Sequence, residues 1–466
     1  MASEAQTSLA EHVRAAGIVG AGGAGFPTHV KLMARADTVI ANGAECEPLL
    51  RCDKAVMRTR TPLVLEGLTH LAEATGAGRA VIALKGHYKD TIAAVRAVAA
   101  RDFPSVEVFE LGNFYPAGDE QVLVHDVTSR VVPEGGIPIQ VGVVVSNVVS
   151  LTQIAEAVSH GRPVTRRALT VAGAVQRSLT CELPIGAPMR LGIQLAGGAT
   201  VDRPVIIEGG PMMGRLVRDL DEPVTKRTSG IVVLAEDHPL VLQKAHTTAR
   251  EILLGHAVCC QCRMCTDLCP RFLLGHELHP NLVMRALTSE GLAHPPPAHV
   301  TAAYICCLCG VCEIACPLWL SPRRVFDEMR LQLRRAGVDN PHRRKECTPH
   351  PDQRSRRVPI PRLVAKLGLE PYAHAPDEVD WTRVTAPRVR ILLSQHTGAP
   401  ARPVVAVGQR VSEGDLVGEI PEGQLGTRIH ASITGVVTAA GPRAIEIEQQ
   451  SALHRGEQGE LTEVSR

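Results

Sequence analysis

Ten of the 14 cysteines of this 466-residue chain lie in two short segments. Each segment, residues 259–270 and residues 306–317, carries the spacing C-x2-C-x2-C-x3-C-P. Three thiolates at this spacing can wrap one face of an iron–sulfur cubane, and in two-cluster ferredoxins the fourth cysteine, just before the proline, ligates the other cluster. The two segments therefore predict two [4Fe–4S] clusters.

By this rule the ligand sets are Cys259, Cys262, Cys265 and Cys316 for one cluster, and Cys306, Cys309, Cys312 and Cys269 for the other. Zinc is the alternative, but zinc sites favour two C-x2-C pairs a dozen or more residues apart. Cys260 and Cys307 match no ligand position and are expected to be packed thiols or thiols that hydrogen-bond to sulfide. His276 and His279 are expected to be core or surface residues.

The glycine-rich loop at residues 20–25 contains residue types that suit the binding of a cofactor. It contains G-x-G-x-x-G, but a helical pattern precedes it where a dinucleotide fingerprint requires a strand, which weakens an ordinary Rossmann interpretation. Glycines still allow a flat ring or a phosphate to approach the backbone. Residues 27–28 open a helix expected over 28–36, and Lys31 lies one turn into it, where it can add charge to a phosphate.

Polar loops follow several expected strands in the first 160 residues. Asn42 and Glu45 follow a strand at 38–41, the loop 115–120 follows a strand at 106–111, and Asn147 follows a strand at 141–145. Strands alternate with helical segments, as in an open α/β sheet, whose ligands bind at the carboxyl ends of the strands. The loops together predict one site.

The rest of the chain predicts a multidomain α/β and α+β protein. We expect an α/β domain at 1–162, a domain of short strands alternating with glycines at 163–240, a helical two-cluster domain at 241–336, a basic proline-rich linker at 337–388, and an all-β domain with a tail at 389–466. Residues 272–291 and 321–337 are expected to be helical. Residues 334–366 carry ten basic residues against three acidic ones, which favours a solvated connector. A contact for an acidic partner or for a nucleotide phosphate is the alternative.

Composition excludes several classes of protein. The net charge of +2 provides no global field for nucleic acid, and no apolar run reaches the ~18 residues of a membrane span. The amino-terminal residues lack the pattern of a secretion signal, so a reducing compartment is expected. A biotinyl or lipoyl carrier needs a lysine at a hairpin tip, and no lysine follows Lys366.

The segments GAGGAGFPTHVK, ANGAECEP, YPAGDEQ, VVSNVVSL and EGGPMMG together resemble a flavoprotein family. This family is shared by the NADH-binding subunit of respiratory complex I, the RnfC electron-transport subunits and the cobalamin reductases of propanediol-utilisation microcompartments. The resemblance implies that the first domain is a Rossmann-like FMN domain, that residues 163–240 are a soluble-ligand-binding β-grasp (SLBB) domain, and that the carboxyl-terminal domain is a barrel-sandwich hybrid.

The resemblance also implies a set of cofactor-binding residues. These are Gly22, Gly23, Ala24, Gly25, Phe26, Lys31, Asn42, Glu45, Tyr115, Gly118, Asp119, Glu120 and Asn147. In the family, the glycine loop and the lysine bind FMN, and the acidic residues of the second loop are associated with flavin and nicotinamide contacts. Asp119 stands where the complex I subunit has glutamate. Phe26 can stack on a ring or serve in packing.

By resemblance, the protein is an oxidoreductase that takes hydride from NADH onto FMN and passes single electrons through the clusters to cobalamin. The implied partners are NADH, cobalamin, an adenosyltransferase and a shell protein, with no nucleic acid and no transmembrane segment. The implied location is cytoplasmic, with a bacterial microcompartment as one candidate. Two alternatives remain open: an RnfC-like subunit of a membrane-associated complex, and a microcompartment electron conduit without NADH oxidation of its own.

Overall fold

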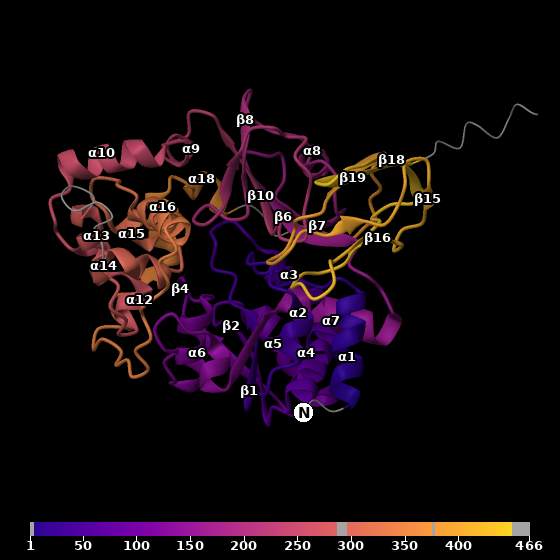
Figure 1. The fold of residues 1–466 in the computed structure, drawn as a ribbon, viewed down its shortest axis with the longest axis horizontal. Helices are drawn as coiled ribbons and strands as arrows, with labels where there is room; N and C mark the ends of the chain where they lie inside the picture. Colours follow the sequence, from indigo (N-terminus) through magenta and orange to yellow (C-terminus); the bar gives the residue numbers. More distant parts are fainter. Residues whose placement is uncertain (1–3, 287–295, 375–377, 450–466) are drawn as a thin grey trace, which may run out of the picture.

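The structure, a computed structural model, describes residues 4–286, 296–374 and 378–449. Figure 1 shows an α/β region at the amino terminus, a mostly β region above it, a helical region to one side and a second β region to the other. None of the described helices is both long and apolar enough to cross a membrane. The expected tail at 450–466 lies outside the described residues.

A four-stranded parallel sheet forms the centre of the N-terminal region (residues 4–162). Its strands, in the order β3-β2-β1-β5, are β3 (Val106–Leu111), β2 (Arg79–Lys85), β1 (Thr38–Gly43) and β5 (Val143–Asn147). β1, β2 and β5 are almost wholly buried, because a parallel sheet is covered on both faces and its strands are rich in Val, Ile and Ala. The expected strands are thus present, with boundaries shifted by a few residues.

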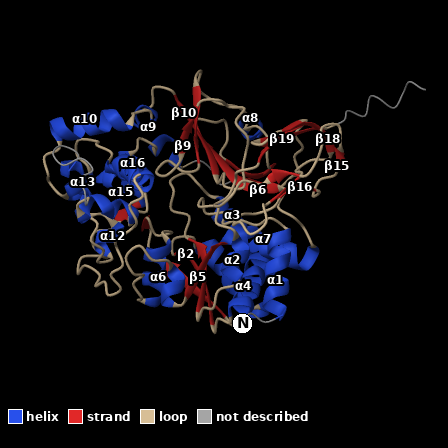
Figure 2. Cartoon of the chain, viewed as in Figure 1, coloured by secondary structure: helices blue, strands red, loops and turns tan. Residues whose placement is uncertain are grey.

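Helices cover both faces of this sheet, as Figure 2 shows. They are α1 (Glu4–Ala15), α2 (Thr28–Leu32), α3 (Cys52–Thr59), α4 (Thr61–Thr75), α5 (Lys89–Asp102), α6 (Glu120–Thr128) and α7 (Val148–His160), with a short β4 (Phe114–Tyr115) and a 3-10 turn η1 (Pro138–Val141). Ala10 and Val13 of α1 are buried in the same core as α4 and α7. The helix expected over 28–36 ends already at Leu32.

A six-stranded sheet forms the second region (residues 163–240). Its order is β12-β7-β6-β10-β8-β9, with β6 (Arg166–Gly173), β7 (Leu179–Pro184), β8 (Pro204–Glu208), β9 (Arg215–Val217), β10 (Gly230–Ala235) and β12 (Glu378–Asp380). The hairpin β6–β7 is antiparallel, while β10 pairs with β6 in parallel. Helix α8 (Met189–Leu195) packs on this sheet, and α9 (Pro239–Lys244) leads out of it.

Short helices make up the helical region (residues 241–336). They are α10 (Thr248–Val258), α11 (Met264–Asp267), α12 (Pro270–Leu273), α13 (Pro280–Ala286), α14 (Ala298–Thr301), η2 (Ala302–Tyr304), α15 (Val311–Ala315) and α16 (Pro322–Arg335). The helix expected over 321–337 is confirmed. The single helix expected over 272–291 is wrong: a turn separates α12 from α13, because Gly275 has a φ of 87° and a Cβ there would clash with the Thr348 carbonyl. Residues 287–291 lie outside the described residues.

Residues 337–374, called the strap below, are tied to the N-terminal region at several points, although most side chains in their first half are exposed or half-buried, as expected of a solvated connector. Arg344 donates to Glu134 (2.7 Å), and Arg357 lies over the Phe114 ring and pairs with Asp126. β11 (Val358–Pro359) pairs with β4, and α17 (Ile360–Lys366) and α18 (Glu370–Ala373) follow. Two basic side chains of the strap, Arg344 and Arg357, therefore bind acids of the N-terminal region.

Two small antiparallel sheets form the C-terminal region (residues 388–449). One has β13 (Arg388–Leu392), β19 (Ala444–Glu448), β18 (Gly435–Ala440) and β15 (Arg410–Val411), and the other has β14 (Arg402–Pro403), β16 (Leu416–Glu419) and β17 (Ile429–His430). Their inward side chains join the core of the N-terminal region. The all-β expectation for this part of the chain agrees with these sheets.

Candidate functional site: a strand-end cavity and two cysteine sets

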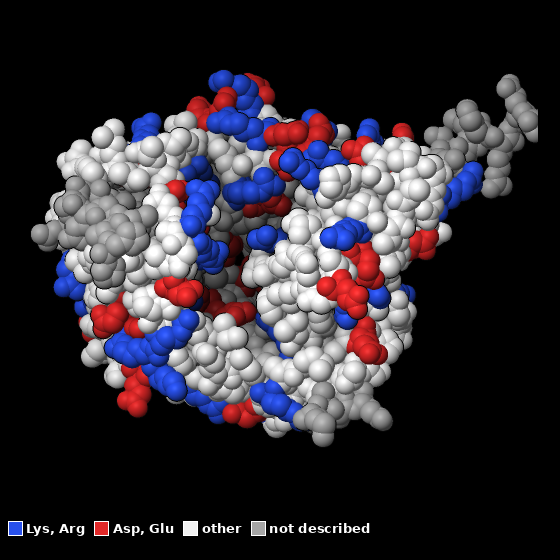
Figure 3. All heavy atoms as spheres, in the orientation of Figure 1, with Lys and Arg blue, Asp and Glu red and all other residues white. Residues whose placement is uncertain are grey.

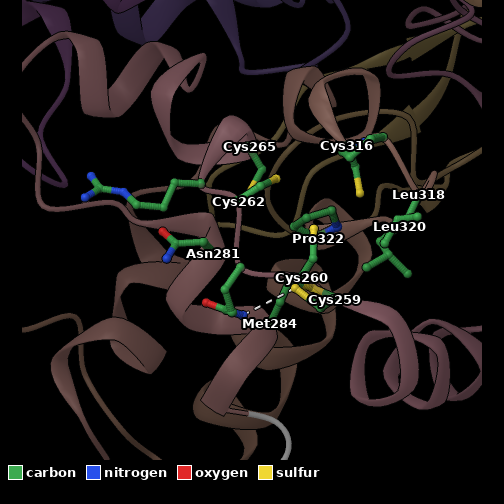
Figure 4. A pocket seen from close by; sticks show the side chains of 13 residues that line it. Cys259, Cys260, Cys262, Cys265, Asn281, Met284, Cys316, Leu318, Leu320 and Pro322 are labelled. Atoms are coloured by element: carbon green, nitrogen blue, oxygen red, sulfur yellow. Dashed lines mark hydrogen bonds between the residues drawn. The ribbon is translucent and has the colours of Figure 1, made fainter.

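Two hollows in the helical region are lined by cysteines. The first hollow, drawn in Figure 4, contains Cys259, Cys260, Cys262, Cys265 and Cys316. The second contains Cys306, Cys307, Cys309, Cys312 and Cys269. Each motif therefore places its first cysteines around one hollow and its last cysteine at the other, which is the crosswise grouping that the spacing predicts. We refer to the cysteines that match the predicted ligand positions as set one (Cys259, Cys262, Cys265, Cys316) and set two (Cys269, Cys306, Cys309, Cys312).

The two motif loops have the same backbone conformation. Gln261 and Arg263 in the first have φ values of 53° and 65°, and Leu308 and Gly310, at the matching positions of the second, have 58° and 80°. These left-handed residues curl each loop around its hollow, and the amide of Leu308 donates to Cys306 Sγ (3.4 Å). Such curled backbone presents N–H groups toward an anionic ligand.

The donor set fits an iron–sulfur cluster. Among the described residues, no three His, Cys, Asp or Glu side chains close on a point that would hold a single metal ion; instead, the sulfurs ring hollows of about 370 and 300 Å³. Burial and the neighbouring thiols of Cys316, Cys259 and Cys262 raise the pKa of Cys265 to about 12. Thiols crowded in this way ionise when iron supplies positive charge.

The two sets differ in their access to solvent. Cys262 of set one is exposed, as is the neighbouring Cys260, whereas Cys269, Cys309 and Cys312 of set two are buried. The exposed apolar side chains of the helical region include Val258, Met264, Leu318 and Trp319, which flank the motif cysteines of set one in the sequence. Set one is therefore the set nearer to the surface.

Set two contacts the N-terminal region through the loop that follows β3. The Tyr115 hydroxyl, which is buried, donates to the carbonyl of Cys309 (2.6 Å). Asp119 forms a bidentate ion pair with Arg271 (2.6 and 2.9 Å), two residues beyond Cys269. Both predicted loop residues thus reach toward the cluster loops. His276 and His279, in contrast, bond to a carbonyl and to a carboxylate and line neither hollow.

The glycine loop at residues 20–25 is held from three regions of the chain. Ser150 Oγ accepts from the loop amide at position 21 (2.8 Å), and Arg167 donates to the carbonyl of the same residue (2.8 Å). Arg227 donates to the carbonyl at position 23 (2.7 Å), and the Thr397 amide donates to that at position 25 (2.9 Å). Gly22 is exposed, and a Cβ on Gly23 would meet no atom within 4 Å. The loop therefore keeps an open side, as a cofactor cradle requires.

Lys31 and Asn42 anchor neighbouring strand ends. The Lys31 ammonium donates to the carbonyl of Val145 (2.7 Å) and lies 3.5 Å from a carboxylate oxygen of Glu120. The Asn42 amide donates to the Gly118 carbonyl (3.0 Å). The structure thus brings the glycine-loop lysine, the first strand end and the loop 115–120 together at one edge of the sheet.

Glu45 and Asn147 converge on a residue that sequence reasoning missed. The amide of Asp53 donates to Glu45 (2.9 Å), and the Asn147 side chain donates to the Asp53 carboxylate (2.9 Å). Burial raises the pKa of Asp53 to about 6, although Arg167 and the Asn147 hydrogen bond lower it. Burial and the charge of Asp53 raise the pKa of Glu45. The strand ends therefore hold a cluster of buried acids.

Two buried cations complete the site and were also missed. Arg167 is 1% exposed and has one guanidinium nitrogen without a partner. Lys85, the last residue of β2, is 3% exposed. Arg167 lies in the second region, and nothing in local spacing links it to the glycine loop. The sequence did offer a signal for Lys85, because this lysine follows five apolar residues at the end of β2.

Figure 3 shows a deep hollow at the centre of one face, with acidic side chains at its floor and basic side chains along its rim. This hollow, which we call the strand-end cavity, opens where Figure 1 places β4 and α3, between the N-terminal, second and helical regions. The turn between β8 and β9 of the second region contacts the loop after β1, because the Glu47 carboxylate accepts hydrogen bonds from the amides of Met212 and Met213 (2.8 Å each). An open α/β sheet binds ligands at such a place.

Three family models match the chain. The Nuo51 FMN-binding domain matches residues 13–156, the 4Fe-4S dicluster domain matches residues 258–321, and the RnfC barrel sandwich hybrid domain matches residues 378–454. The protein is therefore a multidomain protein of mixed α/β class with an FMN-binding domain, an iron–sulfur dicluster domain and a barrel-sandwich domain.

Curated relatives match over different lengths. One subunit of the Na(+)-translocating ferredoxin:NAD(+) oxidoreductase complex of Acetobacterium woodii is 37% identical over 55% of this chain and 56% of its own. The cobalamin reductase PduS of Citrobacter freundii is 42% identical over 95% of this chain and 97% of its own. The cobalamin reductase PduS of Salmonella typhimurium is 44% identical over 94% of this chain and 96% of its own. The chain therefore belongs to the family of the PduS cobalamin reductases.

Proposed function

We propose that this protein is an NADH-dependent cobalamin reductase that carries one FMN and two [4Fe–4S] clusters. The observation that carries the proposal is the contact between the two cofactor sites. Tyr115 and Asp119, from the loop at the strand-end cavity, bond to Cys309 and to Arg271 beside the cysteines of set two. A two-electron site thus adjoins a one-electron site within one chain.

The proposed FMN ligands lie at the edge of the parallel sheet. They are Gly22, Gly23, Ala24, Gly25, Phe26, Lys31, Asn42, Glu45, Tyr115, Gly118, Asp119, Glu120 and Asn147. The open loop and Lys31 suit a phosphate, and the buried strand ends suit a ring. A bound flavin supplies the conversion between hydride transfer and single-electron transfer. The residues hold and orient the reactants, and none is assigned acid–base chemistry.

Finer aspects of the fold belong to the same proposal. The strand order β3-β2-β1-β5, all parallel, supports a Rossmann-like N-terminal domain. A hairpin, a helix and a later strand parallel to the first strand support a β-grasp (SLBB) assignment for the second region. The eight cysteines of set one and set two are the proposed cluster ligands.

The names of the relatives identify the acceptor that we propose. Cobalamin receives the electrons, an adenosyltransferase uses the reduced product, and a shell protein is a partner if the enzyme resides in a microcompartment of the cytoplasm. An RnfC-like subunit is the rival, but relatives of that kind cover little more than half of this chain, whereas the cobalamin reductases cover nearly all of it. The length of the match favours the reductase.

The test is anaerobic NADH oxidation with hydroxocobalamin as the only acceptor. The reconstituted protein should reduce the cobalt, and the variant Lys31→Ala should lose FMN and this activity. The control is Lys89→Ala, since Lys89 is exposed and pairs with Glu110 on the outer part of the sheet. Bleaching of flavin and clusters by NADH without cobalt reduction would favour the RnfC-like role. Absence of bleaching by NADH, with clusters that dithionite still reduces, would favour a conduit.

A further inference from the structure

Lys85 is a buried cation without a protein partner. Its side chain is 3% exposed, and among the described residues no hydrogen bond or ion pair reaches its ammonium group. Among the described residues, the ammonium nitrogen of Lys85 is not one of the wholly buried polar atoms that lack a partner, so it keeps some open surface. Lysines as buried as this one are nevertheless normally paired. This one is therefore expected to face something that the chain itself does not provide.

The nearest acidic groups do not neutralise Lys85. They are the thiol of Cys46 and the carboxyl of Glu45, both in the loop after β1. Burial raises the pKa of Cys46 to about 12, and burial together with Asp53 raises the pKa of Glu45. Both groups hold their protons more strongly than in water, and burial also lowers the pKa of Lys85 itself. The carboxyl ends of β1 and β2 therefore carry a cationic group whose charge no neighbouring carboxylate or thiolate fully balances.

The position of Lys85 in the sheet sets its distance from the glycine loop. Side chains alternate along a strand, so Lys85 shares a face with Val81 and Ala83, and Asn42 shares that face on β1. The order β2-β1-β5 places one strand between Lys85 and the strand end that Lys31 binds. The register pairs Val145 with Ile40 and Ile40 with Val81, so Lys85 lies four residues beyond Val145 along the sheet as well as two strand spacings across it. At about 3.3 Å per residue and about 4.8 Å per strand, the backbone of Lys85 is roughly 16 Å from the carbonyl that Lys31 binds.

Two cations at this spacing suit the two ends of an elongated, doubly polar cofactor. Lys31 lies beside the glycine loop, which suits a phosphate, and Lys85 lies beyond Asn42 at the buried end. We propose that Lys85 faces the isoalloxazine ring of the flavin and stabilises the negative charge that the ring gains on reduction. This inference rests on the proposed FMN site but not on the identity of the electron acceptor.

The test is a redox titration of the full-length, FMN-loaded protein with mediators and dithionite, without NADH or cobalamin. The variant Lys85→Met removes the charge and keeps an unbranched side chain, and Lys85→Arg restores a cation. In Lys85→Met, the affinity for reduced FMN, relative to that for oxidised FMN, should be at least tenfold lower than in the parent. This change lowers the two-electron potential of the bound FMN by at least about 30 mV. Lys85→Arg should recover most of this shift.

Two further measurements separate a charge effect of Lys85 on the flavin from a purely structural one. Lys89→Met removes an exposed charge four residues further along the chain and should leave the potential unchanged. The FMN-free Lys85→Met protein should melt no lower than the FMN-free parent, because the lysine has no partner to lose. If Lys85→Met weakens the binding of oxidised and reduced FMN equally, Lys85 binds the phosphate rather than the reduced ring, and the proposal is overturned. An unchanged potential with full FMN content would overturn it as well.

The titration also keeps this inference apart from the proposed function. A parent protein that binds FMN and shows the expected dependence on Lys85, yet reduces no cobalamin, would leave the flavin role of Lys85 standing and remove the cobalamin assignment. A parent protein without FMN would remove both. The shift in potential is the result that a purely structural lysine would not produce.

Discussion

The ion pair between Asp119 and Arg271 joins the loop at the proposed FMN site to the cysteines of set two, and its removal gives the sharpest test of the structure. The two side chains are 11% and 7% exposed and form two hydrogen bonds, 2.6 and 2.9 Å long. Burial alone would raise the pKa of Asp119, but the charge and hydrogen bonds of Arg271 and the amides of Val122 and Gln121 lower it. Asp119 is therefore a stable carboxylate inside the protein.

The variant Asp119→Asn isolates the charge. Asp119 caps α6 by accepting from the amides of Gln121 and Val122 (3.2 Å each), and asparagine caps a helix about as well as aspartate. The variant therefore keeps the cap and leaves the Arg271 guanidinium buried without its counter-charge. Breaking a buried pair in this way costs about 3 to 5 kcal/mol.

Urea unfolding of the cofactor-loaded protein measures this cost. The matched control is Asp221→Asn, because Asp221 forms a bidentate pair with Arg190 (2.8 and 2.9 Å) whose side chains are 59% and 47% exposed. An exposed pair contributes about 1 kcal/mol or less. The double variant Asp119→Asn with Arg271→Met should recover most of the lost free energy, since no buried charge remains. A cost for Asp119→Asn no larger than that of the control would refute the buried bridge.

Three further predictions concern the cysteines and the buried polar groups. If the crosswise sets hold clusters, the double variant Cys262→Ser/Cys316→Ser should lose only the cluster of set one, whereas Cys262→Ser/Cys269→Ser should lose both clusters. Iron analysis measures the cluster content, with Cys347→Ser as the control. The opposite result for the two double variants would show that each motif binds its own cluster with all four of its cysteines. Tyr115→Phe leaves the Cys309 carbonyl unpaired and should cost about 1 to 3 kcal/mol in urea unfolding; no cost would contradict the contact. Burial lowers the pKa of Lys226 to about 7, so above pH 7 the unfolded chain binds a proton that the folded chain lacks, and stability should rise with pH. Between pH 7.5 and pH 9, the free energy of unfolding of the parent should rise by on the order of 2 kcal/mol relative to that of Lys226→Met. If the difference between the two free energies does not change with pH, the lowered pKa of Lys226 is contradicted.

The features that sequence could predict are those that local spacing encodes. The two cysteine motifs predicted which thiols would surround each hollow, because a C-x2-C-x2-C loop can curl only around its own centre. Asn147 and Asp119 stood out as polar residues after apolar strands, and both cap the helix that follows. The helix expected over 272–291 failed because the positive φ of Gly275 and the proline at position 280 outweigh a helical pattern of apolar residues.

Pairings between distant residues could not be predicted from spacing. The composition of the strap favours a solvated connector, because its basic residues outnumber its own acids. The partners of Arg344 and Arg357 are Glu134 and Asp126, more than 200 residues earlier in the chain. Arg271 likewise follows a cysteine motif in sequence but finds its carboxylate in the N-terminal region. Charge composition within a window therefore says little about whether a segment is solvated when the fold brings complementary charges from elsewhere.

The C-terminal region lacks the lysine of a carrier domain, and its contacts suggest a different purpose. The Thr397 hydroxyl donates to the Ala24 carbonyl (3.0 Å), in addition to the bond from its amide to the glycine loop. Lys226 donates to the carbonyls of Gly17 and Arg428 (2.6 and 2.7 Å), so one ammonium joins three regions just before that loop. A cofactor loop rich in glycine is costly to order, because glycine loses the most backbone freedom on folding. Holding this loop from two other regions offsets that cost. We therefore propose that the barrel sandwich helps to shape the proposed FMN site, a role that needs no covalently attached group.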